Sequence, residues 1–330
     1  MIQEFLHGGA VDLMRKVFPS APEPWIDLST GVNPWAYPTV DLDVSDLRRL
    51  PTAAAYAACR SAMALTFGAP EEAVLVGPGS ELLIRLLPTV IAPRHVAMLS
   101  PAYGAHADVW KAAGCQVTAV DSPLDVSSEV DVLVLCNPGY ADGKLYTPET
   151  LERLRSRLAT RKGWLIVDEA YADLNPQASL ASRGGSDGLI VFRSAGKFFG
   201  LPGARLGALI APSQILTAMV ERLGAWPVSS LALRIGRLAY GDLGWQTDTR
   251  QLLGGACRRL DRILADAGFA SACGTSLYRV IETPSATKTW SRLARRGIYV
   301  RRFPWTEHHL RIGLPPDPEA EDRLVRAFTL

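Results

Sequence analysis

Cysteine is scarce in this chain of 330 residues, and its placement suggests neither a metal site nor a disulfide framework. The five cysteines are odd in number and scattered, without a C-x-x-C pair, at positions 59, 115, 136, 257 and 273. Such a pattern is typical of reduced, mostly buried thiols in a cytoplasmic protein. We therefore expect no bound metal, no disulfide bond and a cytoplasmic location.

The chain also lacks the features of a membrane protein or a nucleic-acid-binding protein. No apolar run reaches the length of a membrane span, and residues 1–5 lack the basic and apolar regions of a signal peptide. The formal net charge is only +2, with arginines spread along the chain, so we expect neither a nucleic acid nor a membrane as partner. No G-x-G-x-x-G motif follows an early strand, which disfavours a nicotinamide-binding protein.

What the chain does have is a regular alternation of short apolar runs and helical patterns. At 330 residues, of which 48% are hydrophobic, it can bury one large core and a smaller one. The alternation predicts an α/β fold with a mostly parallel central sheet. From about residue 270 the chain mixes short strands with two helices, which predicts a small α+β domain. We expect an N-terminal arm with part of the small domain over residues 1–45, a large domain over 46–224 and a small C-terminal domain over 225–330.

The most informative residues lie between Asp168 and Arg205. Asp168 follows the apolar run Trp164–Val167, so its carboxylate is expected at the C-terminal end of a strand. Lys197 lies in a Ser/Gly turn after a second such run, Leu189–Phe192, and Arg205 follows eight residues later. An Asp at a strand end is common, and a lone Lys is usually a solvated surface charge. The ordered set at these spacings is what indicates a cofactor site.

This segment resembles the aminotransferase-like enzymes that use pyridoxal 5'-phosphate (PLP). Their signatures D-x-x-Y and S-x-x-K-x(7)-R are matched by Asp168 to Tyr171 and by Ser194 to Arg205. The resemblance implies the fold of those enzymes, PLP as cofactor and a homodimer. It implies that Lys197 forms the Schiff base and that Asp168 keeps the pyridine nitrogen protonated. It also implies that Ser194 and Arg205 hold the phosphate, and that the Tyr171 hydroxyl donates to the phenolate oxygen of the cofactor.

Two further motifs are similar to parts of that family's site. The segment Gly77–Glu81 links a strand to a helix, where backbone amides and the helix dipole favour a phosphate. A two-glycine turn is common by itself, but here it takes the place of the family's first phosphate loop. The implied cofactor contacts are Gly79, Ser80 and Glu81. Tyr103, in the family's P-x-Y/F segment, is expected to stack on the pyridine ring, although packing at a domain edge is its ordinary alternative.

Asn137 begins a segment that departs from the family pattern. The family usually reads N-P-x-N-P-T-G, whereas this chain reads N-P-G-Y-A-D-G from Asn137 to Gly143. Because the first Asn-Pro is kept, Asn137 is expected to donate to the phenolate oxygen beside Tyr171 and to contact substrate. The altered turn leaves any substrate contact from residues 139–143 unassigned.

Two arginines near the C-terminus are candidate substrate ligands. Arg311 lies in a segment that resembles the family's C-terminal x-R-I/V strand, whose arginine binds the substrate α-carboxylate as a bidentate fork. In phosphate-recognising relatives the equivalent of Arg301 helps to bind substrate. Adjacent arginines such as Arg301 and Arg302 are, however, usually surface residues.

The N-terminal segment distinguishes between branches of the family. His7-Gly8-Gly9-Ala10 and the stretch Asp27–Pro34 resemble the start of the threonine-phosphate decarboxylases of cobalamin biosynthesis. The resemblance implies decarboxylation of L-threonine O-3-phosphate to (R)-1-aminopropan-2-yl phosphate, with His7 and Asn33 as substrate contacts. A solvated terminal histidine is the alternative for His7.

Other functions stay open at this point. Histidinol-phosphate aminotransferases are the closest sibling branch, so transamination of histidinol phosphate or another amino acid is the alternative activity. A non-catalytic protein of the same fold is disfavoured by the intact Lys197 and Asp168. Relatives commonly carry a tyrosine that reaches the neighbouring subunit's cofactor phosphate. Here Leu50 stands in that segment, so the contact is either lost or supplied by Tyr56.

Overall fold

The computed structural model describes residues 8–39, 42–101, 103–269 and 272–329. They form two compact units. The larger unit is Tyr37–Gln246, and the smaller one combines the residues up to Ala36 with those from Thr247 onward. Among the described residues, no helix is both long enough and apolar enough to cross a membrane.

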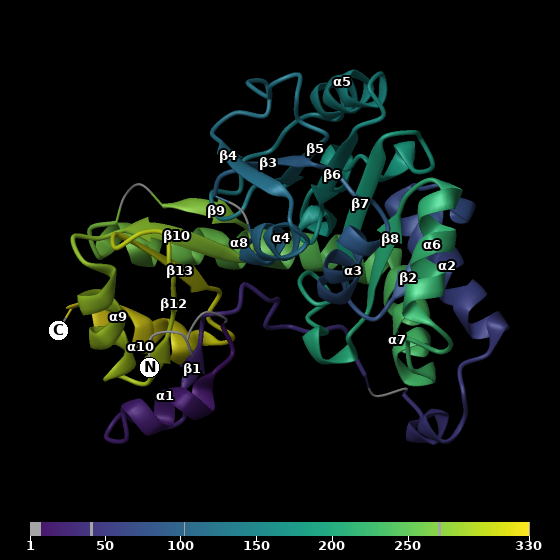
Figure 1. Cartoon of the computed structure of the whole chain (residues 1–330). Helices are drawn as coiled ribbons and strands as arrows, with labels where there is room; N and C mark the ends of the chain where they lie inside the picture. Colours follow the sequence, from purple (N-terminus) through teal and green to yellow (C-terminus); the bar gives the residue numbers. More distant parts are fainter. Residues whose placement is uncertain (1–7, 40–41, 102, 270–271, 330) are drawn as a thin grey trace. The chain divides into compact units, whose positions relative to one another are not determined.

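The larger unit is built on a seven-stranded sheet in the order β2-β8-β7-β6-β5-β3-β4 (Figure 1). Its strands are β2 (Val74–Gly77), β3 (His95–Leu99), β4 (Gln116–Val120), β5 (Val132–Cys136), β6 (Trp164–Asp168), β7 (Leu189–Ser194) and β8 (Gly207–Ile210). β8 runs antiparallel to both of its neighbours, and the other neighbouring strands are parallel. Every residue of β5 and β7 is buried, which explains why β5 and the first four residues of β7 are continuous apolar runs in the sequence.

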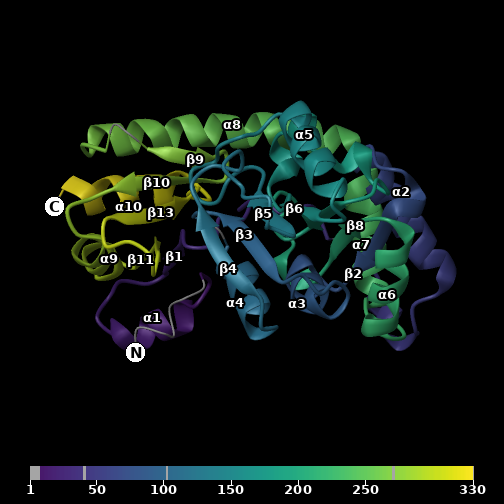
Figure 2. The same cartoon turned by 45° about the horizontal axis from the view of Figure 1, so that its top comes forward.

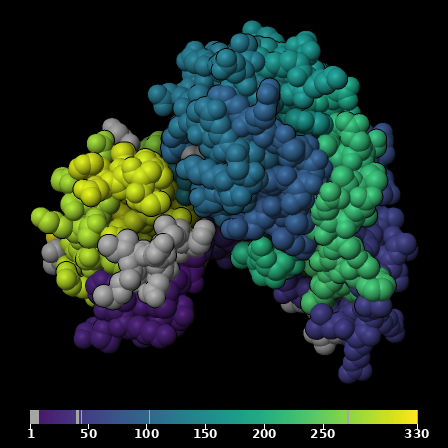
Figure 3. Space-filling view, viewed as in Figure 1, coloured from purple at the N-terminus to yellow at the C-terminus, as the bar shows by residue number. Residues whose placement is uncertain are grey.

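Helices cover both faces of this sheet. They are α2 (Ala53–Phe67), α3 (Ser80–Leu86), α4 (Gly104–Ala112), α5 (Pro148–Ala159), α6 (Ser213–Leu223) and α7 (Ser230–Gly241). Figure 2 shows α3 and α4 on one side of the sheet and α5 on the other. α2 packs along α7, and α6 and α7, in green, form part of the surface of this unit (Figure 3). Short 3-10 turns complete the unit: Val44–Arg48, Glu71–Ala73, Leu87–Thr89, Ala172–Leu174, Pro176–Ala178, Ala181–Arg183 and Pro202–Ala204.

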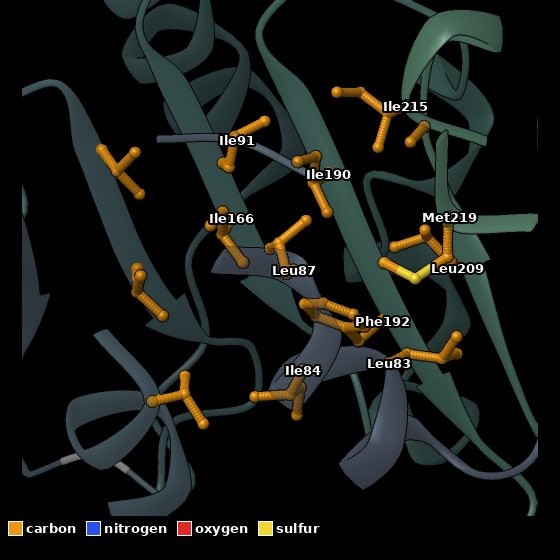
Figure 4. Close-up of a cluster of buried hydrophobic side chains, with 14 of the residues drawn as sticks. Leu83, Ile84, Leu87, Ile91, Ile166, Ile190, Phe192, Leu209, Ile215 and Met219 are labelled. Carbon is orange, nitrogen blue, oxygen red and sulfur yellow. The ribbon is translucent and has the colours of Figure 1, made fainter. Parts of the chain in front are cut away.

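One hydrophobic core lies between the sheet and the helices α3, α4 and α6. Figure 4 shows Ile166, Ile190 and Phe192 of the sheet beside Leu83 and Ile84 of α3, together with residues of α6. These sheet residues are fully buried. Burying each such side chain contributes about 1.5–3 kcal/mol, so this core holds the strand ends in fixed positions.

The smaller unit contains two sheets and the remaining helices. β1 (Ile26–Asp27) pairs in parallel with β11 (Ile298–Tyr299). An antiparallel sheet has the order β12-β13-β10-β9. These strands are β9 (Cys273–Thr275), β10 (Tyr278–Glu282), β12 (Arg301–Arg302) and β13 (His309–Gly313). The helices are α1 (Val11–Val17), α9 (Ala286–Ala294), α10 (Pro318–Thr329) and α8 (Leu243–Asp266), whose first turn belongs to the larger unit.

The α/β class and the mostly parallel central sheet agree with the sequence prediction. The units divide the chain differently from the expected 1–45, 46–224 and 225–330. Residues 225–246 group with the larger unit because α7 packs along α2. The N-terminal segment belongs to the smaller unit because its strand β1 pairs with β11.

Candidate active site

Two neighbouring parallel strands end in candidate residues at the same edge of the large sheet. β6 ends at Asp168, which pairs in register with Phe192 of β7, and β7 ends at Ser194. The turns that follow carry Tyr171 and Lys197, and the Lys197 Nζ lies 5.7 Å from the centre of the Tyr171 ring. The fold therefore brings together the acid, the tyrosine and the lysine that the sequence singled out.

The Asp168 carboxylate is held by two hydrogen bonds. Its Oδ2 lies 3.0 Å from the Nε2 of His106, and its Oδ1 accepts from the backbone amide of Ala170 at 3.1 Å. Because a carboxylate only accepts hydrogen bonds, the His106 ring is the donor. His106 is 1% exposed and Asp168 is 7% exposed. His106 was not predicted from the sequence; it lies in the first turn of α4, three residues after Tyr103, which precedes the helix.

Tyr103 connects this pair to the turn between β2 and α3. Its ring centre lies 6.4 Å from that of His106 and 6.2 Å from that of Tyr140, both edge-on. Its hydroxyl donates to Glu81 Oε2 at 3.0 Å. Burial, with the nearby Glu81 carboxylate, raises the pKa of Tyr103, so the hydroxyl stays protonated as a donor. The other oxygen of Glu81 accepts from Arg85 Nε at 2.7 Å. Both carboxylate oxygens of Glu81 thus accept a hydrogen bond from a side chain.

The expected phosphate residues of the β2–α3 turn lie beside Arg205. Gly79 has a φ of +83°, and a Cβ there would lie 3.0 Å from an Arg205 Nη2 atom. A side chain at Gly79 would therefore be strained and would crowd the guanidinium. Gly207 approaches the same turn, since a Cβ on it would lie 2.7 Å from the amide nitrogen of Ser80. Ser194 Oγ accepts from the Gly196 amide at 3.2 Å, inside the lysine turn.

Asn137 makes side-chain hydrogen bonds to backbone groups of its own chain. Its Nδ2 donates to the carbonyl oxygens of Tyr146 at 3.2 Å and Ala178 at 2.9 Å. Its Oδ1 accepts from the Tyr146 amide at 2.9 Å. From the sequence, this amide is expected to donate to the cofactor. In the structure it donates to one carbonyl in its own loop and to another, of Ala178, outside that loop.

The smaller unit brings its two candidate arginines together. Arg301 and Arg311 are paired directly across β12 and β13, and both are buried. Arg311 Nη2 donates to the Ser29 carbonyl at 2.6 Å, and its guanidinium lies 5.1 Å from the ring centre of Tyr278. Within the described residues, the buried Nε of Arg311 has no hydrogen-bond partner. Two buried cations side by side repel each other, so this arrangement suits an anion.

The remaining candidates are placed as follows. Asn33 is buried, and its Oδ1 accepts from the Trp35 amide at 2.9 Å. His7 lies outside the described residues. The Tyr56 hydroxyl donates to the carbonyl of Val228 at 3.3 Å and accepts from its amide at 3.0 Å. That hydroxyl is therefore used within its own chain.

Fold and sequence both identify the class of protein: the chain belongs to the class I and II aminotransferase family, whose model matches residues 23–328. It is 36% identical to the threonine-phosphate decarboxylase of Sinorhizobium sp over 99% of this chain and 98% of the relative. It is 37% identical to the threonine-phosphate decarboxylase of Pseudomonas aeruginosa, covering 98% and 96%. It is 27% identical to the histidinol-phosphate aminotransferase of Geotalea daltonii, covering 93% of each.

Solved structures share the fold at low sequence identity. The histidinol-phosphate aminotransferase of Sinorhizobium meliloti, in complex with pyridoxal-5'-phosphate, superposes with a TM-score of 0.83 at 17% identity. The alignment covers 96% of this chain and 93% of that chain. The L-threonine-O-3-phosphate decarboxylase of Porphyromonas gingivalis has a TM-score of 0.76 at 18% identity, covering 92% and 98%. The predicted family and its fold are confirmed.

Proposed function

We propose that this protein is a PLP-dependent decarboxylase that converts L-threonine O-3-phosphate to (R)-1-aminopropan-2-yl phosphate in cobalamin biosynthesis. The observation that carries this proposal is the extent of the likeness to threonine-phosphate decarboxylases. Two of them match at 36% and 37% identity over nearly the full length of both chains. Histidinol-phosphate aminotransferases match at 25–28%. Transamination of histidinol phosphate is the second candidate, because one of those relatives is also covered over 93% of its length.

The larger unit fits PLP. When bound, PLP supplies an electron sink for the carbanion left when a bond to Cα breaks. Lys197 Nζ would hold the cofactor covalently, and Asp168, which is hydrogen-bonded to His106, would keep a proton on the pyridine nitrogen. Arg205, the adjoining amides of residues 79–81 and Ser194 bind the phosphate. The Tyr171 hydroxyl is a further donor to the cofactor, and Tyr103 packs on its ring.

The smaller unit fits the substrate, which carries two anionic groups. Arg311 binds the α-carboxylate through a planar fork, and Arg301 binds the phosphate with Asn33 and His7. Holding both anions orients the substrate, and that orientation determines which bond to Cα breaks. Displaced from PLP by the substrate amine, Lys197 would have a free Nζ ammonium that could donate a proton to Cα once CO₂ has left. We also propose that the enzyme is a cytoplasmic homodimer whose larger unit is the PLP-binding domain.

The test uses purified protein, PLP and L-threonine O-3-phosphate, with product followed by mass spectrometry in the presence and absence of 2-oxoglutarate. We expect aminopropanol phosphate and CO₂ without the keto acid, and no product from a Lys197→Ala variant. If no product forms from this substrate, and histidinol phosphate instead yields glutamate only when 2-oxoglutarate is present, the protein is the aminotransferase.

A further inference from the structure

The loop that follows β5 is the part of the site where this chain departs from the family pattern. Against N-P-x-N-P-T-G the chain reads N-P-G-Y-A-D-G, so Tyr140 takes the position of the second asparagine. Asn137 keeps the position of the first. Only one of these two side chains has an arrangement that suits a contact with the cofactor.

Asn137 anchors the base of the loop. Its amide donates to two backbone carbonyls and accepts from one backbone amide, as described above. The residue is 1% exposed. Redirecting its amide toward a ligand would leave buried carbonyl oxygens without a donor, at a cost of about 1–3 kcal/mol each. Asn137 is thus a structural residue of the loop.

The turn beyond Asn137 is tight. The Gly139 amide donates to the Lys144 carbonyl at 2.7 Å, and the Gly143 amide donates to the Gly139 carbonyl at 2.9 Å. Asp142 Oδ1 accepts from the Lys144 amide at 3.0 Å. A Cβ at Gly139 would lie 2.5 Å from that same Oδ1, so the turn closes only around a glycine. These bonds fix the backbone on both sides of Tyr140 and therefore the position from which its side chain starts.

Tyr140 lies against the residue that the proposed function places on the cofactor ring. Its ring centre is 6.2 Å from that of Tyr103, at an interplanar angle of 71°. The side chain is half-buried, and it lines a small cavity with Cys136 and Ser100. The buried Cys136 pairs in register with Asp168 at the strand ends. Tyr140 therefore belongs to the same edge of the sheet as the catalytic residues.

We propose that Tyr140, and not Asn137, is the residue of this loop that contacts the cofactor, with its hydroxyl donating to the phenolate oxygen. This assignment rests on the proposed function. The hydroxyl supplies the donor that an asparagine amide offers in the family pattern, and its ring supports Tyr103 from the side. Because the contact comes from a phenol on a rigid turn, the site keeps a donor at this position although the asparagine is absent.

The test compares Tyr140→Phe with wild type and with Tyr146→Phe as the matched control. Tyr146 is in the same loop and lines the same cavity. Titration of each apoprotein with PLP gives the dissociation constant. The visible absorbance of each holoenzyme, followed against pH, gives the midpoint of its titration. Thermal unfolding of each apoprotein gives its Tm. Because the acceptor is an ionised phenolate, loss of one donor predicts a PLP dissociation constant about 10- to 150-fold higher and an absorbance midpoint about one to two pH units higher. The midpoint rises because the donor favours the ionised phenolate. We expect the apo Tm to stay within 2–3 °C of wild type, and Tyr146→Phe to change neither binding nor midpoint.

Asn137→Ala should change the stability of the protein and leave the titration of the bound cofactor unchanged, the reverse of Tyr140→Phe. We expect a lower apo Tm and an unchanged absorbance midpoint in the protein that folds. A raised midpoint in Asn137→Ala, or a midpoint and affinity unchanged in Tyr140→Phe, overturns the assignment while leaving the proposed function intact. Failure of the wild-type protein to bind PLP overturns both.

Discussion

The hydrogen bond between His106 and Asp168 offers a direct test of how the site holds its acid. In His106→Leu a side chain of similar size replaces the imidazole and removes the donor. The bond is 3.0 Å long and both side chains are buried. A hydrogen bond to a charged group contributes about 1.5–3 kcal/mol, which corresponds to about a 10- to 150-fold weaker affinity for PLP. The affinity falls because Asp168 keeps its bond to Ala170 but loses its second support.

The assay is an equilibrium titration of apoprotein with PLP, followed by its visible absorbance, together with kcat for the decarboxylation. His106→Gln keeps an amide donor of similar reach and should recover at least part of the loss. His95→Leu is the matched control. The His95 ring lies 3.0 Å from the neutral Thr118 hydroxyl, and His95 begins β3, whereas Tyr103 follows the other end of that strand. If His106→Leu binds PLP within twofold of wild type with an unchanged kcat, the reasoning that Asp168 depends on His106 is wrong.

Three further changes test other parts of the structure. Arg193→Met removes the guanidinium that pairs with Glu169 at 3.0 Å and with Asp173, all fully buried. It should cost about 3–5 kcal/mol in urea unfolding of the apoprotein, and a loss below 1 kcal/mol would contradict this. Arg311→Lys keeps the charge but not the fork, so KM for the substrate should rise at least tenfold with a smaller change in kcat. Burial raises the pKa of Cys257 from 9.0 to about 11. The folded state therefore retains a proton on Cys257 that the unfolded state loses, so this thiol should lower the free energy of unfolding by about 3 kcal/mol as pH rises from 9 to 11. Cys257→Ala should lack that part of the fall in pH-dependent denaturation.

The fold was predictable where the sequence carries long, regular patterns. The buried strand β5 is an unbroken apolar run, and β6 is one up to the aspartate at its end, so both strands could be located from the sequence. β12 was not predicted, because a strand of two arginines has no apolar alternation. It pairs with β13 across a short connection, and a strand of two residues carries no pattern that sets the register of that pairing. The sequence could therefore name Arg301 but could not show that it is buried opposite Arg311.

The candidate site was predictable from motif residues, whereas the residues that hold them were not. Lys197 and Asp168 stand in spaced signatures that one sequence can show. His106 stands in no motif and becomes meaningful only when α4 places it against Asp168. Asn137 illustrates the reverse case, since the motif is present but the surrounding backbone uses its amide. The sequence cannot show which groups bind this amide, because its partners lie up to 41 positions away along the chain.

The contacts of Glu81 explain how a carboxylate can lie next to a proposed phosphate site. A carboxylate in the turn proposed to bind a phosphate would repel that anion if it were unpaired. Here Oε1 accepts from Arg85 and Oε2 accepts from the Tyr103 hydroxyl, so a cation and a hydroxyl donor offset the negative charge. Arg205 lies over Gly79 and adds positive charge at the turn. The same carboxylate that could weaken phosphate binding instead fixes Tyr103, and through Tyr103 and His106 the turn is linked to Asp168.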